Sequence, residues 1–386
     1  MLGLYVHIPF CLSKCAYCDF HSIVADEELV GNYLDALYNE IRISASIVQS
    51  QVISTLYIGG GTPTRLNSRQ LEALIVQLKT NFNYAPDFEF TIEANPGTLT
   101  EEKAAVLASQ GVNRISLGAQ AFQNCILRKA GRTHTVEDVY RSVELLKHFG
   151  ISNINLDLIY GLPNQTLTDW IESLKLATAL KPRHLSCYSL TIEENTLFYD
   201  LYKNKNLQLP TEEVEFAMFD SNRKILPSIG YRHYEISNFA LPGFKAKHNI
   251  IYWQNQAYLG LGSGAHGCFN QIRYYNSYDI NQYIHNWQKL TPAVAHCQYI
   301  DLDRTMDETM MLGLRLLDGV KHADFEQRFH HSLDEIYGKE IKKLISRGLL
   351  EKNEKCLRLT KQGVSLGNLV FSAFIRGKSQ EQTLDK

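Results

Sequence analysis

The stretch LYVHIPFCLSKCAYC, residues 4–18, joins a β-rich run to three closely spaced cysteines. The run LYVHI is short and rich in strand-forming residues, and a turn signal follows it. Cys11, Cys15 and Cys18 therefore fall in the loop directly after a predicted strand. Thiols this close in one loop are able to converge on one metal centre. The stretch predicts a metal-binding loop after the first strand of the chain.

Three thiols leave several kinds of metal site open. A structural zinc site needs a fourth nearby ligand, for which His7 and His21 are the local candidates. A conventional ferredoxin cluster needs a fourth cysteine at a set spacing, and Cys125 is remote in the sequence. On a [4Fe–4S] cluster, three cysteines leave one iron free for the amino and carboxylate groups of a small molecule. The spacing C-x3-C-x2-C, with an aromatic residue before the last cysteine, is typical of radical S-adenosylmethionine (SAM) proteins. It favours the cluster over zinc or inert cysteines.

Strand-like and helix-like segments alternate through the first half of the chain. Strand-like runs begin at Leu4, Thr55, Phe88, Arg114, Ile154 and His184. Segments with helical spacing lie between them, at residues 29–47, 68–78, 100–110, 135–149 and 166–180. This order predicts an α/β fold with a parallel sheet, either an open doubly wound sheet or an incomplete (β/α) barrel. In both, the ligand site lies beyond the carboxyl ends of the strands.

The chain changes character after residue 190. Residues 191–304 are polar, aromatic and rich in glycine, which predicts an irregular accessory region packed on the sheet. A winged-helix-like module is predicted over 305–376, with helices at 306–317, 323–329, 333–347 and 363–374 and a hairpin at 349–359. Glu335 and Glu340 interrupt the basic residues of its third helix, so we expect packing rather than DNA binding. The polar tail 377–386 is expected to be frayed.

The composition excludes several classes of protein. The 386 residues include 39 Lys and Arg against 41 Asp and Glu, a net charge of −2 that supplies no broad basic field for nucleic acid. No window approaches the ~20 apolar residues of a spanning helix, and the amino terminus does not resemble a signal peptide. The eight cysteines are few for this length, unlike a secreted disulfide framework. We therefore expect a cytoplasmic protein without a nucleic-acid partner.

Motifs spread over nearly the whole chain resemble one protein family. They are residues 5–20 and the segments GGGTPT (59–64), EANP (93–96), GAQ (118–120), DLIYGLP (157–163) and YEISN (234–238). With the C-terminal module, they resemble the oxygen-independent coproporphyrinogen III oxidase family of radical SAM proteins, and most closely its haem chaperone branch, HemW. The resemblance implies a partial (β/α)6 barrel of radical SAM type over residues 1–190. It also implies a [4Fe–4S] cluster on Cys11, Cys15 and Cys18 with SAM at the open iron.

The resemblance assigns further residues to SAM. Gly60 and Gly61 lack side chains, so the backbone there is able to approach a ligand closely, and in the family this loop, with Thr62, contacts the methionine part of SAM. Glu93 would accept a hydrogen bond from an ammonium or a ribose hydroxyl. Tyr5 and Tyr17 flank the cysteines and would shield the cluster or pack on the ligand.

Three further polar residues, Gln120, Arg132 and Asp157, occupy strand ends or the loops after them. They would place an amide, a cation and an anion around one ligand site at the carboxyl ends of the strands. Arg132 and Asp157 either bind the carboxylate and ribose of the ligand or pair with each other. In the related oxidase the matching positions serve a second SAM.

Two functions compete within the family. The resemblance implies reductive cleavage of SAM to methionine and a 5′-deoxyadenosyl radical, with the electron supplied through the cluster by a donor. An oxidase would use this chemistry on porphyrinogen propionates, whereas a carrier would bind haem and deliver it to an apo-haemoprotein. The oxidase has a substantial segment before its cysteines, but here the first cysteine is already Cys11. This difference favours the carrier, for which any membrane contact would be peripheral and made through a partner.

The segment HNIIYW, residues 248–253, matches the HNxxYW motif associated with haem in the carrier branch. On a helix, His248 and Tyr252 share a face, so His248 would be an axial iron ligand beside the aromatic walls Tyr252 and Trp253. His266, after a glycine-rich turn, is a second candidate ligand. A haem-sensing winged-helix regulator is a third hypothesis, against which the mixed charge of the C-terminal helix argues.

Overall fold

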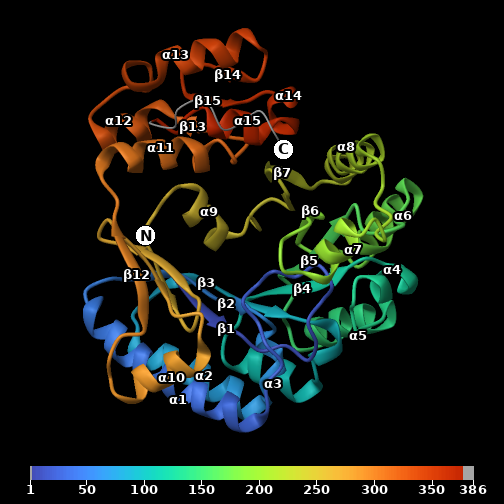
Figure 1. Cartoon of the computed structure of the whole chain (residues 1–386), viewed down its shortest axis with the longest axis vertical. Coiled ribbons are helices and arrows are strands. Elements are labelled where there is room, and N and C mark those ends of the chain that lie inside the picture. The colour runs from blue at the N-terminus through green and yellow to red at the C-terminus, as the bar shows by residue number, and fades with distance from the viewer. Residues whose placement is uncertain (1, 377–386) are drawn as a thin grey trace.

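The computed structural model describes residues 2–376 (Figure 1). The predicted tail, 377–386, lies outside these residues. Six parallel strands pair in chain order, as predicted. They are β1 (Leu2–Ile8), β2 (Ile53–Gly60), β3 (Tyr84–Ala94), β4 (Arg114–Gln120), β5 (Ile154–Tyr160) and β6 (His184–Ser189). The predicted α/β fold with a parallel sheet is therefore confirmed.

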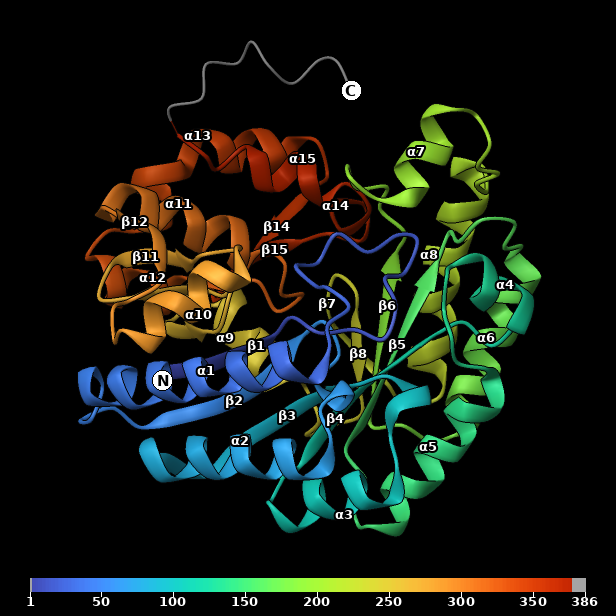
Figure 2. The ribbon, with the colours of Figure 1, turned by 60° about the horizontal axis from the view of Figure 1, so that its bottom comes forward.

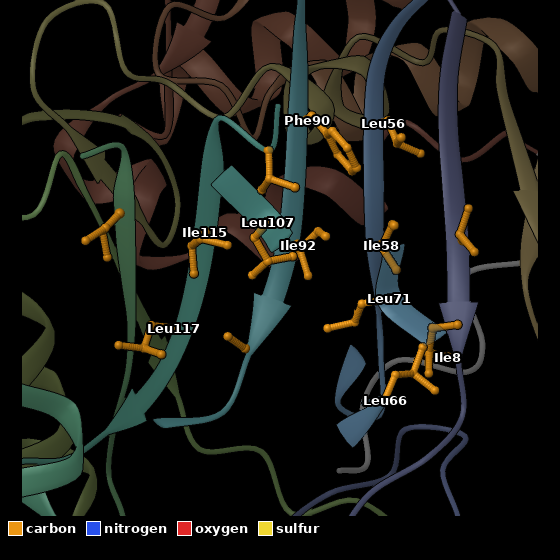
Figure 3. Close-up of a cluster of buried hydrophobic side chains, with 14 of the residues drawn as sticks. Ile8, Leu56, Ile58, Leu66, Leu71, Phe90, Ile92, Leu107, Ile115 and Leu117 are labelled. Carbon is orange, nitrogen blue, oxygen red and sulfur yellow. The ribbon is translucent and has the colours of Figure 1, made fainter. Parts of the chain in front are cut away.

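Helices follow the first five strands and cover the outer face of the sheet (Figure 2). They are α1 (Glu27–Ile47), α2 (Ser68–Asn81), α3 (Glu101–Ser109), α5 (Val136–His148) and α6 (Leu167–Ala179), with the short α4 (Asn124–Lys129), η1 (Pro63–Arg65) and η2 (Pro96–Thr98) between them. In α1, Val30, Leu34, Leu37 and Ile41 are buried at helical spacing, which explains why this face packs on the strands. Figure 3 shows the resulting core, in which Leu71 of α2 and Leu107 of α3 lie among aliphatic residues of the strands.

The accessory region was predicted to be irregular, but this prediction is wrong. The region instead forms regular strands that extend the sheet at both ends. It adds β7 (Arg232–Glu235) and β8 (Asn238–Ala240) beyond β6, and β9 (Tyr258–Leu261), β10 (His266–Phe269), β11 (Ile272–Asn276) and β12 (Val294–Tyr299) beyond β1. Its helices are α7 (Leu197–Lys203), α8 (Glu212–Ser228), α9 (Lys247–Trp253) and α10 (Ile280–Gln288). Strand β9 runs parallel to β1, whereas the other added strands pair antiparallel. The sheet stays open, with β12 and β7 at its edges.

The C-terminal module contains helices and a small sheet, as predicted. Its elements are α11 (Leu302–Gly313), β13 (Val320–Lys321), α12 (His322–Phe329), α13 (Leu333–Ser346), β14 (Leu350–Lys352), β15 (Cys356–Leu359), α14 (Lys361–Ser365) and α15 (Gly367–Ser372). The prediction of one helix over 363–374 is wrong, because the helical conformation is interrupted at Leu366, between α14 and α15. Gly363 and Gly367 weaken a continuous helix, and a Cβ on Gly363 would meet the Leu349 carbonyl oxygen at 2.0 Å. Within residues 2–376, no helix combines the length and the apolar character needed to cross a membrane.

A buried carboxylate ties helix α1 to the added strands. Glu40 is only 3% exposed, and its Oε2 accepts hydrogen bonds from the Gly262 N–H at 2.7 Å and the Tyr283 hydroxyl at 2.5 Å. Its Oε1 accepts from Asn276 Nδ2 at 2.7 Å. These donors come from the loop after β9, from α10 and from β11. Because one side chain satisfies all three, Glu40 holds the accessory strands beside β1.

Glu40→Ala is expected to lower the free energy of unfolding by about 3 kcal/mol, because it leaves buried donors without an acceptor. Urea titration at pH 8 followed by circular dichroism measures the change. Glu144→Ala, at an exposed position of α5, is the matched control and is expected to change stability little. Equal stabilities for the two variants would contradict this role of Glu40.

Candidate functional site

Backbone hydrogen bonds fix the cysteine loop between its neighbours. Beside it, the Gly61 N–H donates to the Ile8 carbonyl at 2.9 Å, and the Thr62 N–H donates to the Phe10 carbonyl at 2.8 Å. On the other side, the Ala16 N–H donates to the Ala130 carbonyl at 3.1 Å. The loop after β1 is therefore held between the loop that follows β2 and the carboxyl end of α4.

Cys11, Cys15 and Cys18 line one cavity of about 470 Å³, which we call the first cavity. Arg132 Nη1 donates to Cys15 Sγ at 3.3 Å, and Arg132 Nη2 donates to the Gly118 carbonyl at 2.9 Å. The pKa of Cys18 is raised to about 11, chiefly by burial and to a smaller extent by the neighbouring Cys15 and Cys11 thiols. Three thiols facing one cavity beside a guanidinium are a donor set suited to a group that takes negatively charged sulfur ligands.

No three His, Cys, Asp or Glu side chains within residues 2–376 are arranged to hold a single metal ion. A cubane cluster takes one thiolate on each of three irons, so its ligands need not converge on one point. The fit to a [4Fe–4S] cluster rests on the three cysteines that line one cavity, with the Arg132 guanidinium beside Cys15.

Glycines bring the backbone to the edge of this cavity. Gly60 has a φ of 112°, and a Cβ there would meet the His7 ring at 2.5 Å. A Cβ on Gly61 would meet the Phe10 carbonyl oxygen at 2.8 Å. Glycine is therefore required at both positions for packing against His7 and Phe10, and the expected approach to a ligand stays a prediction.

Glu93, at the end of β3, faces the same edge. Its carboxylate accepts from the Tyr57 hydroxyl at 2.7 Å and from the Gly60 N–H at 3.0 Å. Burial raises the pKa of Glu93 to about 7, although the bond from Tyr57 opposes this shift. The structure therefore holds a buried, hydrogen-bonded carboxylate beside the glycine edge.

Asp157 and Arg132 do not pair with each other in the described part of the chain. The Asp157 carboxylate accepts from Ser116 Oγ at 2.9 Å and from Asn155 Nδ2 at 2.8 Å. Gln120 ends β4 with a φ of 65°, a left-handed conformation that is uncommon for a residue other than glycine. Backbone strain of this kind is often found at functional sites.

The first cavity brings together all of the predicted cluster and SAM residues except Tyr5. They are Cys11, Cys15, Tyr17, Cys18, Gly60, Gly61, Thr62, Glu93, Gln120, Arg132 and Asp157. Tyr5 instead lines a different cavity, and its hydroxyl lies 2.9 Å from His7 Nδ1. Ser116 and Asn155 also line the first cavity, although the sequence analysis did not select them. The signal that could have identified them is a polar residue that alternates with apolar residues along β4 and β5.

Helix α9 carries the HNIIYW segment and lies between the sheet and the C-terminal helices (Figure 1). His248 is 1% exposed, with its Nδ1 2.7 Å from Thr55 Oγ1 and its Nε2 2.8 Å from the Tyr252 hydroxyl. Its ring stacks on Tyr57 at 5.1 Å, and burial lowers the pKa of His248 to about 3. In this conformation His248 therefore presents no free ring nitrogen to an iron, contrary to the expectation.

Buried polar groups anchor the amino end of α9. Glu89, another residue absent from the sequence analysis, accepts from the Lys247 N–H at 2.9 Å and the His248 N–H at 3.0 Å. The neighbouring Ala246 N–H donates to the Tyr234 hydroxyl at 3.2 Å, which in turn lies 2.8 Å from His184 Nε2. These contacts fix where the aromatic end of α9 points.

That aromatic end borders a second cavity of about 700 Å³. Tyr252 and Trp253 line it together with residues of β1, β9, β10, β11 and α11. His266 also lines it, as do His7 and His21. The cavity shares Asp19, Phe20, Gly60 and Glu93 with the first cavity. The two cavities are therefore neighbours with a common wall.

Two family descriptions match separate parts of the chain. Residues 5–177 match the Radical SAM superfamily, and residues 300–366 match the HemN C-terminal domain. A solved structure described as coproporphyrinogen III oxidase (HemN) from Escherichia coli, a radical SAM enzyme, has a TM-score of 0.85 and 25% sequence identity. That match covers 97% of this chain and 89% of the other.

Curated relatives match at higher identity over nearly their full length. The heme chaperone HemW of Lactococcus lactis is 40% identical over 96% of each chain. HemW of Bacillus subtilis is 38% identical over 97% of this chain and 99% of its own. On these matches, the chain belongs to the HemW family of haem chaperones within the radical SAM superfamily.

Proposed function

We propose that this protein binds haem and transfers it to an apo-haemoprotein. The observation that carries the proposal is the second cavity, whose wall includes Tyr252 and Trp253 of the HNIIYW segment. Its volume of about 700 Å³ lies within the usual range for ligand pockets, about 300–1,000 Å³. Two aromatic rings supply flat apolar surface of the kind that packs on a porphyrin. Membership of the HemW family supports the same function.

We further propose that Cys11, Cys15 and Cys18 hold a [4Fe–4S] cluster and that SAM binds in the first cavity. When bound, the cluster supplies the electron for reductive cleavage of SAM. Arg132 offsets negative charge at Cys15, because its guanidinium lies 3.3 Å from that sulfur. The cluster requires an electron donor as a further partner.

Within the first cavity, each residue has a distinct task in the proposal. The backbone of Gly60 and Gly61, with Thr62, contacts the amino acid part of SAM. Glu93 accepts from an N–H of its amino group, and Asp157, oriented by Ser116 and Asn155, accepts from ribose. Tyr17 and Gln120 close the remaining sides and limit the entry of water.

The oxidase alternative has less support. The HemN structure shares 25% identity with this chain, whereas the HemW relatives share 38–40%. We also propose that the protein works in the cytoplasm, where free thiols stay reduced, without a nucleic-acid partner and with any membrane contact made through a partner.

Replacing Cys11, Cys15 or Cys18 by Ala is expected to abolish the cluster, because each thiolate is the only protein ligand of one iron. Iron and sulfide are measured in anaerobically prepared protein. Cys125→Ala and Cys297→Ala change exposed thiols outside both cavities and are expected to retain the full cluster. Retention in Cys15→Ala, with loss in either control, would overturn the assignment.

SAM affinity is expected to rise with pH through about 7 and then to level off. Burial raises the pKa of Glu93 to about 7, so its carboxylate becomes an ionised acceptor for the amino group of SAM only as the pH passes that value. Glu93→Gln is expected to flatten this profile and to weaken binding about tenfold at pH 8, the loss of one charge-assisted hydrogen bond. Anaerobic equilibrium dialysis with labelled SAM measures both effects. An unchanged pH profile in Glu93→Gln would count against this contact.

The purified protein is expected to bind haem, to pass it to an apo-haemoprotein and to leave coproporphyrinogen III unconverted. The Soret band follows binding and transfer, and product analysis under reducing, anaerobic conditions with SAM tests for oxidase activity. Efficient formation of protoporphyrinogen would establish the oxidase alternative instead.

A further inference from the structure

The motif histidine, His248, lies behind the wall of the second cavity and not on it. Its two ring nitrogens contact Thr55 and Tyr252, and its ring stacks on Tyr57. An axial ligand must offer a nitrogen lone pair to iron. To do so, His248 would have to break a buried hydrogen bond and leave a polar partner unsatisfied. In its observed position, His248 instead holds Tyr252, which lines the cavity, through the contact with the Tyr252 hydroxyl.

Another histidine meets the requirements of a ligand. His266, the first residue of β10, lines the second cavity and is exposed. Its Nε2 lies 2.8 Å from the hydroxyl of Tyr278, which is itself 48% exposed, while its Nδ1 has no hydrogen-bond partner within residues 2–376. An imidazole oriented through one nitrogen, with the other free, is a common arrangement for a metal-binding histidine.

The other histidines of the cavity are less available. His7 is engaged at both nitrogens, by the Tyr5 hydroxyl at 2.9 Å and the His21 carbonyl at 2.8 Å. His21 is half-buried, stacks on His7 at 5.7 Å and lies 3.0 Å from Ser263 Oγ through its Nε2. His266 is therefore the histidine of this cavity that can change its contacts most easily.

We propose that His266 is the axial ligand of a haem iron in the second cavity, and that His248 is a positioning residue acting through Tyr252. This assignment rests on the proposed haem-binding function and specifies its site. The ligand bond forms when a neutral imidazole nitrogen donates its lone pair to iron. Tyr252 and Trp253 pack against the porphyrin from α9, and Met311 and Leu312 of α11 line the same cavity from the C-terminal module. Haem therefore lies between the sheet and the C-terminal module.

The test is a haem titration of the full-length protein and its His266→Ala and His266→Gln variants. Both variants are expected to lose the wild-type Soret position and to bind about tenfold more weakly. Free imidazole is expected to restore the Soret position in His266→Ala, because it fits the space left by the ring. His285→Ala, an exposed histidine of α10 outside both cavities, is the matched control. Circular dichroism and cluster content verify that each variant is folded.

His248→Ala and Tyr252→Phe test the positioning role. Each is expected to weaken haem binding while leaving the Soret position unchanged, and their effects should not add, because both remove the same contact. Additive effects would contradict action through Tyr252.

The possible outcomes distinguish a failure of the His266 assignment from a failure of the proposed haem-binding function. Wild-type protein that binds no haem would overturn the proposed function. Haem binding by the wild type with an unaltered spectrum in both His266 variants would overturn only the ligand assignment. Loss of the wild-type spectrum in His248→Ala, restored by imidazole, would identify His248 as the ligand instead.

Discussion

The parallel register of β1 and β2 aligns His7 with Gly59 and Ile8 with Gly60, so the loops that follow both strands begin at one level. The hydrogen bond from the Gly61 N–H to the Ile8 carbonyl extends this pairing past the end of the sheet. Through that contact the cysteine loop meets the glycine edge. Because strand side chains alternate between faces, a slip of β3 by one residue against β2 would also turn Glu93 away from the cavity. The chemistry of the first cavity depends on this alignment.

Helix α9 illustrates how polar groups inside a protein specify position. The N-cap residue of α9, Ala246, has no side chain that can accept a hydrogen bond. Glu89 of β3 accepts from the first N–H groups of the helix instead, and His248 contacts Thr55 of β2. Each contact removes an unsatisfied polar group from the interior and fixes the helix on two strands at once. The aromatic end of α9 is thereby directed at the C-terminal module. Under the proposed assignment, His248 shapes the ligand site without touching the ligand.

The sequence was sufficient for the six parallel strands and their helices, because their hydrophobic periods are long and regular. It was also sufficient for most of the first cavity, because carboxyl ends of parallel strands meet at one edge. It could not reveal β7–β12, whose three to six residues are too short to be distinguished from loops. Tyr5 lines the second cavity and not the first, together with Tyr258 of β9, a strand that the sequence did not predict. Nor could spacing show that both nitrogens of His248 are engaged.

The common wall of the two cavities has a consequence for genetics. Asp19, Phe20, Gly60 and Glu93 border both, so a substitution at any of them alters two binding surfaces and yields a mixed phenotype. Asp157 borders only the first cavity and Trp253 only the second. Under the proposed assignment of the two cavities, alleles at these two positions separate cofactor defects from cargo defects in a living cell. A complementation experiment built on Glu93 alone would assign both defects to one cause.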